Sequence, residues 1–380
     1  MSYEQVASHR YMVFDGRRNA AYVRALETII TPDSVVLDIG AGLGVLGLFA
    51  AKLGAKKVYL VEPESVIDVA RKAAADSGLD NVAFIRAPLD EVTEDIRADV
   101  IISVFTGNML FGEDLLPTLF KARDRFLAPG GVMLPDAARL MVAPVSAPEG
   151  YAHHVSDWDG FPAFCAQHKL PELDYRGARS FAANTLVYDM GSKYTQEPLA
   201  EPAQALELDL ASATEAGCNT SAEVAINTAG TVHGWQSWFS MRLAGEWYST
   251  ARSAGPTHWS ETFLPLAEPL AVNPGDVLDI RLSRPEYGEW SWITRHGDGQ
   301  QRQSSFLSRP LAPADLAKNA ASYKPVRNER GHAAARALEL MNGEHTVAEI
   351  AAIMREEFPV LYPDEAAATR LLRGLVQQLS

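Results

Sequence analysis

Val35-Val-Leu-Asp-Ile-Gly-Ala-Gly-Leu-Gly-Val-Leu-Gly-Leu-Phe-Ala-Ala51 is the stretch that decides the fold of this chain. A short apolar run ends at Ile39, three glycines alternate with other residues over 40–44, and a helix-forming run of Leu, Phe and Ala then begins. The pattern predicts a strand, a tight turn and the start of a helix. Because glycine leaves no Cβ between backbone N–H groups and a ligand, we expect a cofactor to lie over this turn.

The next predicted strand, Lys57-Val-Tyr-Leu-Val61, leads directly into Glu62. An acidic residue about 20 positions after the glycines is placed to accept hydrogen bonds from ribose hydroxyls. We therefore expect a nucleoside cofactor. A glycine turn that binds nothing is the weaker explanation.

The spacing of the glycines separates two classes of cofactor. A dinucleotide site needs G-x-G-x-x-G from the end of the strand, which would require glycine where Val45 stands. A frame from Gly42 to Gly47 would place its last glycine within the helix. The spacing Gly40-x-Gly42-x-Gly44 fits better, so S-adenosylmethionine is favoured over a nicotinamide or flavin cofactor.

The length and the net charge of the chain limit the number of domains and the kinds of partner that can be expected. At 380 residues the chain exceeds a typical domain of about 100 to 200 residues, so two or three units are expected. The net charge of −14 argues against a nucleic-acid partner, because phosphate binding needs clustered lysine and arginine.

Cysteine usage and hydropathy add two further expectations. Cys165 and Cys218 stand far apart, without partners at metal-ligand spacing, so neither a disulfide framework nor a metal site is expected. The sequence has no signal-like start and no apolar run long enough to cross a membrane. A cytoplasmic protein without a membrane partner is predicted.

Residues 1–135 alternate helical and strand-like runs, which predicts a doubly wound, Rossmann-like α/β domain that binds the cofactor. From His9, a loop is expected to enter a helix that continues to about Ile30 and covers the ligand. A helix near residues 65–76 and a strand at 82–86 follow, and then Asp90, where an adenine amino group could be met. Ala128-Pro-Gly-Gly131 predicts a turn near the end of this unit.

A buried strand is expected at residues 99–103, followed by a loop over 104–113. Ligands of doubly wound sheets lie beyond the carboxyl ends of the strands, so this loop should face the reacting centre. A helix is expected from about Glu113 to Phe126. Glu113 is the best candidate to orient a nitrogen that carries a proton, although an acid at the start of a helix can also serve only to stabilise its dipole.

Helical periodicity fades from residue 136, and residues 136–310 predict a β-barrel or sandwich. A partly helical insertion at 150–180 interrupts the strands with Trp158, Phe161, Phe164 and Tyr175. These aromatic residues could form an ordinary packing face, or an exposed arm that a second subunit buries. Strands are expected at 139–145, 184–189, 206–210, 223–227, 232–243, 262–266, 277–282 and 291–294.

After a linker near Pro310 to Pro325, residues 326–380 are helical again. Thr346-Val-Ala-Glu349 is a capping box, and apolar residues continue at helical spacing as far as Phe358. A last helix carries another apolar stripe. We expect a small separate helical module.

Three motifs in this order resemble the protein arginine methyltransferases, over residues 9–284. The first, His9-x-x-Met12-x-x-Asp15-x-x-Arg18-x-x-x-Tyr22, is similar to the helix with which that family covers its cofactor. The second is the glycine turn with its following acids. The third, Thr257-His258-Trp259 followed by Glu261-Thr-Phe263 and the Gly275-Asp276 turn, resembles the loop that the barrel donates to the active site.

This resemblance implies the roles of individual residues. Arg18 would hold the methionyl carboxylate of S-adenosylmethionine, Asp15 and His258 would pair across the two domains, and the 150–180 insertion would be the dimerisation arm of a homodimer. The expected catalytic residues are Glu113, His258 and Asp15. The expected cofactor contacts are Met12, Arg18, Asp38, Gly40, Gly42, Gly44, Glu62, Leu89 and Asp90.

The chain departs from the family in the loop that receives the methyl acceptor. The family has two glutamates there, whereas this sequence has Val104 at the first position and Glu113 at the second. A guanidinium is a planar fork that two carboxylates meet best. We therefore expect weak activity on ordinary arginine-rich peptides and a less cationic acceptor, with Asp114 and Glu261 out of position to replace the missing acid.

Three functions are compatible with these observations. The leading one is a methyltransferase that acts on a side chain of a peptide or protein. The others are a small-molecule N- or O-methyltransferase and a cofactor-binding scaffold without activity, which the retained Glu113 argues against. The C-terminal module weakly resembles the winged-helix peptide-binding domains of ribosomal-peptide modification pathways, although a helical hairpin used only for packing is about as consistent with the pattern.

Overall fold

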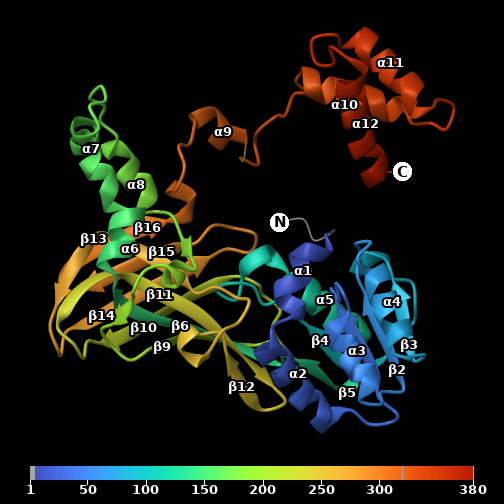
Figure 1. Ribbon diagram of the computed structural model, residues 1–380, viewed down its shortest axis with the longest axis horizontal. Coiled ribbons are helices and arrows are strands. Elements are labelled where there is room, and N and C mark those ends of the chain that lie inside the picture. Colours follow the sequence, from blue (N-terminus) through green and yellow to red (C-terminus); the bar gives the residue numbers. More distant parts are fainter. Residues whose placement is uncertain (1–4, 319, 380) are drawn as a thin grey trace. The chain divides into compact units, whose positions relative to one another are not determined.

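The computed structural model describes residues 5–318 and 320–379. The chain divides after Pro310 into two compact units, each of which is described by itself (Figure 1). The first unit contains a parallel α/β domain and an antiparallel barrel-like domain, and the second is helical.

The α/β domain is built on a five-stranded parallel sheet in the order β3-β2-β1-β4-β5. The order reverses between β1 and β4, which pair with Ile39 opposite Ser103. The carboxyl ends of these two strands form the switch point where such sheets bind ligands. The strands are β1 (Val35–Ile39), β2 (Lys57–Val61), β3 (Val82–Ile85), β4 (Ala98–Ser103) and β5 (Leu127–Leu134).

Helices pack on both faces of this sheet because the strands are apolar on both sides. The Asp15 side chain caps α2 by accepting a hydrogen bond from the Arg18 backbone N–H, which sets the start of that helix. The helices are α1 (Val6–Val13), α2 (Gly16–Ile29), α3 (Val45–Lys52), α4 (Ile67–Asp76) and α5 (Leu116–Phe126).

Two local predictions in this domain are wrong. The stretch from His9 that was expected to be a loop is helical and belongs to α1. His9 is the only buried residue of this helix, so its sequence shows almost no apolar stripe from which a helix could be predicted. The expected turn at 128–131 lies within β5, where pairing with β4 shifts register between Ala98 and Val100. Gly130 has φ 79°, and the additional residues of β5 relative to β4 form a bulge-like irregularity in the strand.

The barrel-like domain consists of two antiparallel sheets, as the alternating pattern predicted. Two buried tryptophans tie the sheets together: the Trp235 indole N–H donates to Thr294 Oγ1 (2.9 Å) and that of Trp292 donates to the Pro265 carbonyl (2.8 Å). The first sheet contains β6 (Ala137–Ser146), β7 (Val187–Tyr188), β8 (Glu197–Pro198), β9 (Ala203–Asp209), β11 (Gly230–Leu243), β12 (Glu246–Ser249) and β13 (Thr262–Val272). The second contains β10 (Cys218–Ala225), β14 (Val277–Arg284), β15 (Ser291–His296) and β16 (Gly299–Ser304).

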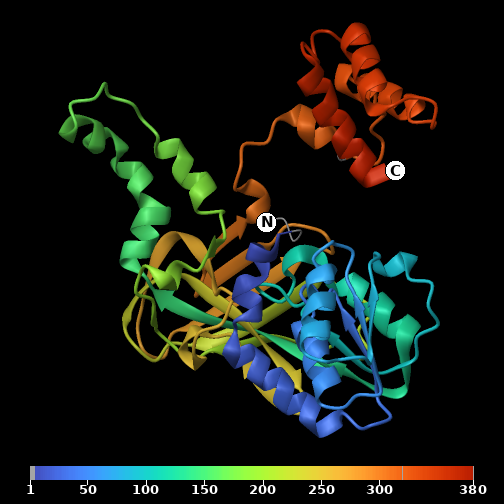
Figure 2. The ribbon, with the colours of Figure 1, turned by 45° about the vertical axis from the view of Figure 1, so that its right-hand side comes forward.

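The expected insertion near 150–180 is a helical arm that projects from the barrel (Figure 2). Its helices are α6 (Pro148–His154), α7 (Phe161–Gln167) and α8 (Arg179–Ala182). Phe161 contacts Phe164 and Tyr175, with ring centroids 5.5 and 4.8 Å away. Phe164 and Tyr175 nevertheless stay 46% and 47% exposed, so the arm does not bury its own aromatic residues.

The second unit is a three-helix bundle of α10 (Glu329–Leu340), α11 (Val347–Glu357) and α12 (Glu365–Leu379), preceded by α9 (Pro313–Lys318) in the expected linker. The capping box at the start of α11 is confirmed, with Thr346 and Glu349 bonding reciprocally. Its core is separate from that of the first unit and includes Ala333, Ile350 and Met354. A winged-helix domain needs a β-hairpin as its wing. The described residues of this unit contain no strand, because only short connections join its helices, so the expected wing is absent from them.

Within the described part of the chain, no helix combines the length and the apolar character needed to cross a membrane. The cytoplasmic location stays a prediction.

Candidate functional site

The glycine turn after β1 adopts left-handed backbone at all three expected positions. Gly40, Gly42 and Gly44 have φ of 63°, 55° and 75°. A Cβ on Gly42 would lie 2.8 Å from His9 Nδ1, and one on Gly44 would lie 2.8 Å from Leu60 Cδ1. Only glycine permits both this conformation and this close approach.

Glu62 lies at the end of β2 and is buried against this turn. Its Oε2 accepts a hydrogen bond from the Gly42 backbone N–H (2.8 Å), and its Oε1 accepts one from the Glu64 N–H (3.0 Å). Each carboxylate oxygen can accept a second hydrogen bond. The carboxylate is therefore fixed beside the turn and still able to accept hydrogen bonds from ribose hydroxyls.

Asp38 is buried one residue before the end of β1. Burial raises the pKa of Asp38 to about 7, against the opposing hydrogen bond from the Gly47 N–H (2.8 Å) and the charge of Arg18. The Gly47 bond ties the strand to the first turn of α3. Asp38 therefore fixes the glycine turn from beneath, by holding the start of α3 against the end of β1.

Arg18 is a buried cation on α2. Its Nη2 donates to the Met12 carbonyl (2.7 Å) and to Asn19 Oδ1 (2.8 Å), which joins α2 to α1. Burial lowers the pKa of Arg18, while the nearby Tyr22, Asp15 and Asp38 oppose that shift. A buried guanidinium of this kind is suited to an anionic group such as a carboxylate.

Asp15 and His258 form the expected pair between the two domains of the first unit. Asp15 Oδ2 lies 2.8 Å from His258 Nδ1, and it also accepts hydrogen bonds from the His258 backbone N–H (2.9 Å) and from Thr257 Oγ1 (2.8 Å). Burial would raise the pKa of Asp15, but these bonds lower it well below its ordinary value. Burial lowers the pKa of the His258 imidazole despite the opposing effect of Asp15.

Trp259 supports this pair from the barrel side. Its ring centroid lies 3.9 Å from that of His258, and it contacts Phe239 edge-on at 5.2 Å. The loop that follows β12 is thereby held between a buried aromatic core and the cap of α2.

We call residues 104–114, which follow β4, the acceptor loop. It starts beside the glycine turn, since Ser103 is in register with Ile39. The Tyr22 hydroxyl donates to the Ser103 carbonyl (2.8 Å), and Asn108 Oδ1 accepts a hydrogen bond from the Ser260 N–H (3.0 Å). The loop is thus attached both to α2 and to the barrel.

Glu113 is an exposed residue of this loop. The explanation that it only stabilises the dipole of the following helix is not supported, because α5 begins at Leu116 and Glu113 has φ 69°. Its charge, with that of Asp15, opposes the lowering of the His258 pKa that burial causes. Glu113 therefore lies within electrostatic range of the Asp15–His258 pair.

The missing first glutamate has no substitute among the nearby acids. Val104 is half-buried and packs against the main core. Asp114 pairs with Arg284 at 2.6 Å, and Glu261 accepts hydrogen bonds from Gln236 Nε2 and from the Arg252 N–H (2.7 Å).

Two further predicted cofactor residues, Leu89 and Asp90, follow β3. Leu89 is buried in a short 3₁₀ turn after β3. Asp90 follows it with a 75% exposed side chain, 3.3 Å from Lys121 Nζ. The structure therefore does not bring the Asp90 carboxylate into the buried cluster.

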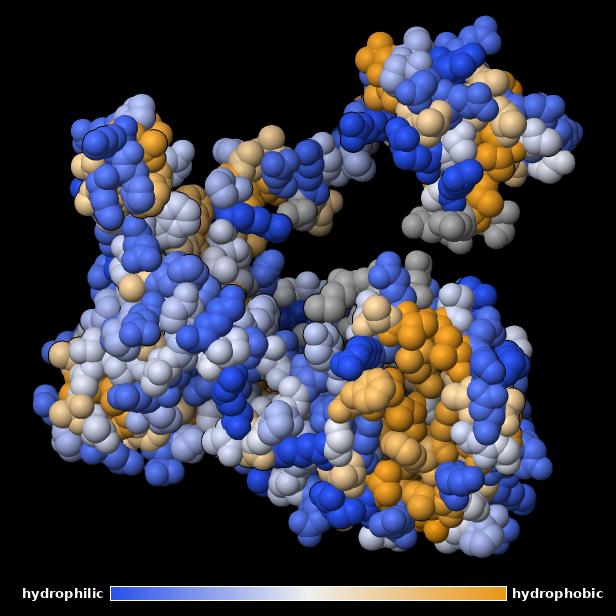
Figure 3. All heavy atoms as spheres, in the orientation of Figure 1, coloured by the Kyte–Doolittle hydropathy of each residue, from blue (hydrophilic) through white to orange (hydrophobic). Residues whose placement is uncertain are grey.

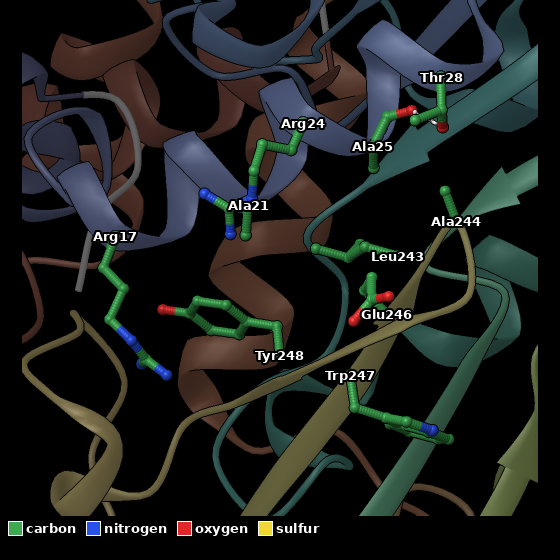
Figure 4. Close-up of a pocket in the computed structure, with 10 residues that line it drawn as sticks. All are labelled: Arg17, Ala21, Arg24, Ala25, Thr28, Leu243, Ala244, Glu246, Trp247 and Tyr248. Carbon is green, nitrogen blue, oxygen red and sulfur yellow. Dashed lines mark hydrogen bonds between the residues drawn. The ribbon is translucent and has the colours of Figure 1, made fainter.

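A separate hollow of about 300 Å³ lies between α2 and the β11–β12 hairpin (Figure 4). The Arg17 guanidinium stacks on the Tyr248 ring there, 4.3 Å from its centroid. None of the predicted site residues lines this hollow.

The residues around the glycine turn fit S-adenosylmethionine. A buried cation, a buried acid at the end of β2 and left-handed glycines provide for its carboxylate, ribose and close backbone approach. Ser103 Oγ and Thr106 Oγ1 are buried beside them without a hydrogen-bond partner among the described residues, which is unusual in a folded protein unless a ligand or water serves them. The described part of the chain has no group of three or more His, Cys, Asp or Glu placed to hold a metal.

Sequence reasoning missed Thr106, Asn108 and Arg284. The only signal for Asn108 was its position in the loop expected to face the reacting centre. Nothing in the sequence distinguishes Arg284, because a buried arginine is recognised only from its partner in space.

Two family models match the chain. Residues 36–131 match a methyltransferase domain, and residues 136–289 match an arginine methyltransferase oligomerization subdomain. Both matched ranges end before the C-terminal unit, so the winged-helix resemblance stays a prediction.

Several proteins resemble the chain in sequence. Protein arginine N-methyltransferase 2 of Xenopus tropicalis is 31% identical over 73% of this chain and 66% of its own length. Protein arginine N-methyltransferase 6 of Xenopus laevis is 29% identical over 74% of this chain and 85% of its own length. The chain spans 37% to 66% of the first three curated relatives it matches.

Solved structures show the same fold. The Trypanosoma brucei PRMT1 enzyme-prozyme heterotetrameric complex with AdoHcy has a TM-score of 0.71 and 24% identity, over 80% of this chain and 99% of that one. Protein arginine methyltransferase 10 of Arabidopsis thaliana has a TM-score of 0.67 and 22% identity, with the same coverage. These likenesses confirm the predicted α/β domain followed by a barrel-like domain.

Proposed function

This chain is a protein arginine methyltransferase-like chain, as its motifs predicted, and from that premise we propose that it transfers a methyl group from S-adenosylmethionine to a side chain of a peptide or protein. The observation that carries the proposal is the buried Asp15–His258 pair. It holds the barrel loop against the helix that carries Arg18, so one cluster combines residues suited to the cofactor with residues suited to the methyl acceptor.

Glu62 would accept hydrogen bonds from the ribose hydroxyls, Arg18 would face the carboxylate, and the glycine turn would let the cofactor approach the backbone. The bound cofactor supplies an electrophilic methyl group on a sulfonium. Transfer of that group needs little covalent help from the protein, because the nucleophile must only lie in line, at close range and without water.

The remaining chemistry is the handling of one proton. Glu113 would orient a nitrogen that carries a proton. The lowered pKa of His258 keeps its imidazole neutral near pH 7. With Nδ1 donating to Asp15, Nε2 carries the lone pair that can accept a proton.

The acceptor loop argues for a less cationic acceptor than a free arginine side chain. With Val104 in place of an acid, and with Asp114 and Glu261 paired elsewhere, Glu113 is left to meet the acceptor with one carboxylate. A buried, unpaired donor of a guanidinium costs about 1 to 3 kcal/mol. Because the relatives are named for arginine, arginine-rich peptides are the first acceptors to compare with amide, amine and carboxylate side chains.

A homodimer is proposed from two surfaces of the first unit. The arm leaves aromatic residues exposed, including Phe164 and Tyr175. Apolar side chains also gather on the face of the α/β domain that carries α3 (Figure 3). The match to an oligomerization subdomain over residues 136–289 supports this assignment.

A peptide-recruiting role is proposed for the C-terminal unit. It has its own apolar core behind a linker, so it can fold without contributing to the site. Truncation after Pro325 should leave cofactor binding intact and raise the apparent KM for a peptide acceptor. A truncated chain that does not fold would contradict this role.

Calorimetry on Glu62→Ala tests the cofactor assignment. Loss of a charged acceptor costs about 1.5 to 3 kcal/mol, so S-adenosylmethionine should bind at least about tenfold more weakly. Glu223→Gln, an exposed change on β10, is the control and should bind as the wild type does. Unchanged affinity in Glu62→Ala, or tighter binding of a nicotinamide dinucleotide, would refute the assignment, and intact-mass analysis with labelled cofactor identifies the acceptor.

A further inference from the structure

The acceptor loop holds a conformation that its own residues do not favour. Met109, Leu110, Glu113 and Asp114 have φ of 52°, 69°, 69° and 56°, although none of them is glycine. Left-handed backbone is unfavourable for such side chains and persists only where surrounding contacts impose it. The position of the Glu113 carboxylate therefore depends on whatever holds this loop.

Arg284 provides the strongest of these contacts. It is the last residue of β14, 7% exposed, and its Nη2 donates to Asp114 Oδ1 at 2.6 Å. An arginine this deeply buried needs a charged partner. Asp114 is that partner, and it directly follows Glu113 in the chain.

Two further contacts attach the same loop to the barrel. The Phe111 ring meets the Trp290 ring edge-on, with centroids 5.8 Å apart. Asn108 Oδ1 accepts a hydrogen bond from the Ser260 N–H, next to the loop that carries His258. The Arg284 pair acts at the end of the loop nearest Glu113, so it sets the orientation of that residue most directly.

We infer that Arg284 is a positioning residue for methyl transfer, which clamps the acceptor loop through Asp114 so that Glu113 points at the acceptor. This inference rests on the proposed function. It also assigns the Asp114 carboxylate to Arg284, so that Glu113 alone meets the acceptor. The clamp joins the carboxyl end of β14, in the second sheet of the barrel, to the loop that follows the carboxyl end of β4 in the parallel sheet.

Four single variants and the double variant Arg284→Met with Asp114→Asn test the clamp. Arg284→Met removes the charge and keeps much of the volume, Arg284→Lys restores a charge, and Asp114→Asn removes the acid with a residue that tolerates left-handed φ. The matched control is Arg281→Met on the same strand, where the side chain of an exposed arginine donates a hydrogen bond to Asn219. For each we would measure kcat, the KM for the peptide acceptor, the Kd for S-adenosylmethionine and hydrogen exchange of residues 107–114.

Arg284→Met and Asp114→Asn should each lower kcat about 10- to 100-fold, the size expected of a misplaced catalytic group, with the Kd for the cofactor unchanged. Exchange of 107–114 should rise in both, Arg284→Lys should recover part of kcat, and the double variant should be no worse than either single one. Arg281→Met should match the wild type.

Unchanged kcat and unchanged exchange in Arg284→Met and Asp114→Asn would overturn the inference. Additive losses in the double variant would overturn it as well, because the two residues would then act separately. If the wild type methylates no acceptor, the proposed function fails, and exchange of 107–114 in the same variants still decides whether the clamp exists.

Discussion

The glycine turn and the acceptor loop leave the same edge of the parallel sheet from neighbouring strands, yet they reach left-handed backbone in opposite ways. Gly40, Gly42 and Gly44 adopt it without strain. The acceptor loop adopts it at four residues that carry side chains, at a cost of about 1 to 2 kcal/mol for each of Met109, Leu110 and Glu113. The cofactor half of the site is therefore encoded locally, whereas the acceptor half depends on barrel residues 152 to 179 positions later in the chain.

The largest effect is expected from Glu113→Gln, which removes the charge of the acceptor loop and leaves the glycine turn untouched. Methyl transfer should fall at least about 100-fold, as for the loss of a positioned acid or base. The Kd for S-adenosylmethionine should not change. Glu223→Gln is the matched control, and a fully active Glu113→Gln would place the chemistry elsewhere.

The glycine turn is tested by Gly42→Ala against Gly54→Ala. Both positions have positive φ, but a Cβ on Gly42 would lie 2.8 Å from His9 Nδ1, whereas nothing lies within 4 Å of one on Gly54. Cofactor affinity in Gly42→Ala should fall by about 1 to 3 kcal/mol through backbone strain and displacement of α1. Gly54→Ala should lose thermal stability alone, and equal cofactor binding in the two variants would show that the turn does not hold the ligand.

Val104→Glu sharpens the comparison on the acceptor side. If the missing carboxylate limits guanidinium binding, kcat/KM for arginine-rich peptides should rise about tenfold or more, because a buried donor gains a charged partner. Val104→Gln supplies a similar shape without the charge and should have little effect. Robust arginine methylation by the wild type that Val104→Glu does not change would show that one carboxylate suffices.

The smallest effect concerns pH. Burial lowers the pKa of His258, so its signal in proton NMR, assigned with His258→Ala, should titrate below the ordinary value near 6.5. Because the folded pKa is the lower one, the unfolded chain binds the proton first as the pH falls below about 6.5. This histidine therefore opposes folding on the acid side and has no effect on stability above that pH. A titration above 6.5 would mean that the charge of Asp15 outweighs burial.

Several elements were predictable because their signals are local. The strands β1 and β2 have the expected bounds, because each is a short apolar run that ends directly before a polar or turn residue, Gly40 for β1 and Glu62 for β2. The capping box at Thr346 needs only two side chains within one turn. The helix α1 and the strands β8, β12 and β16 were missed, because none carries a strong apolar period of its own.

The sequence by itself determined the glycine turn, the acid after β2, the order of the two domains and the Asp15–His258 pairing, the last through a motif resemblance. Each of these depends on residue types at fixed short spacing. Only the tertiary structure decided that Asp90 points to solvent, that Glu113 lies outside α5 in a strained loop, and that Arg284 holds Asp114. The physical reason is that strain and the partner of a buried charge are set by contacts between residues far apart in the chain, and a single sequence carries no signal for such contacts.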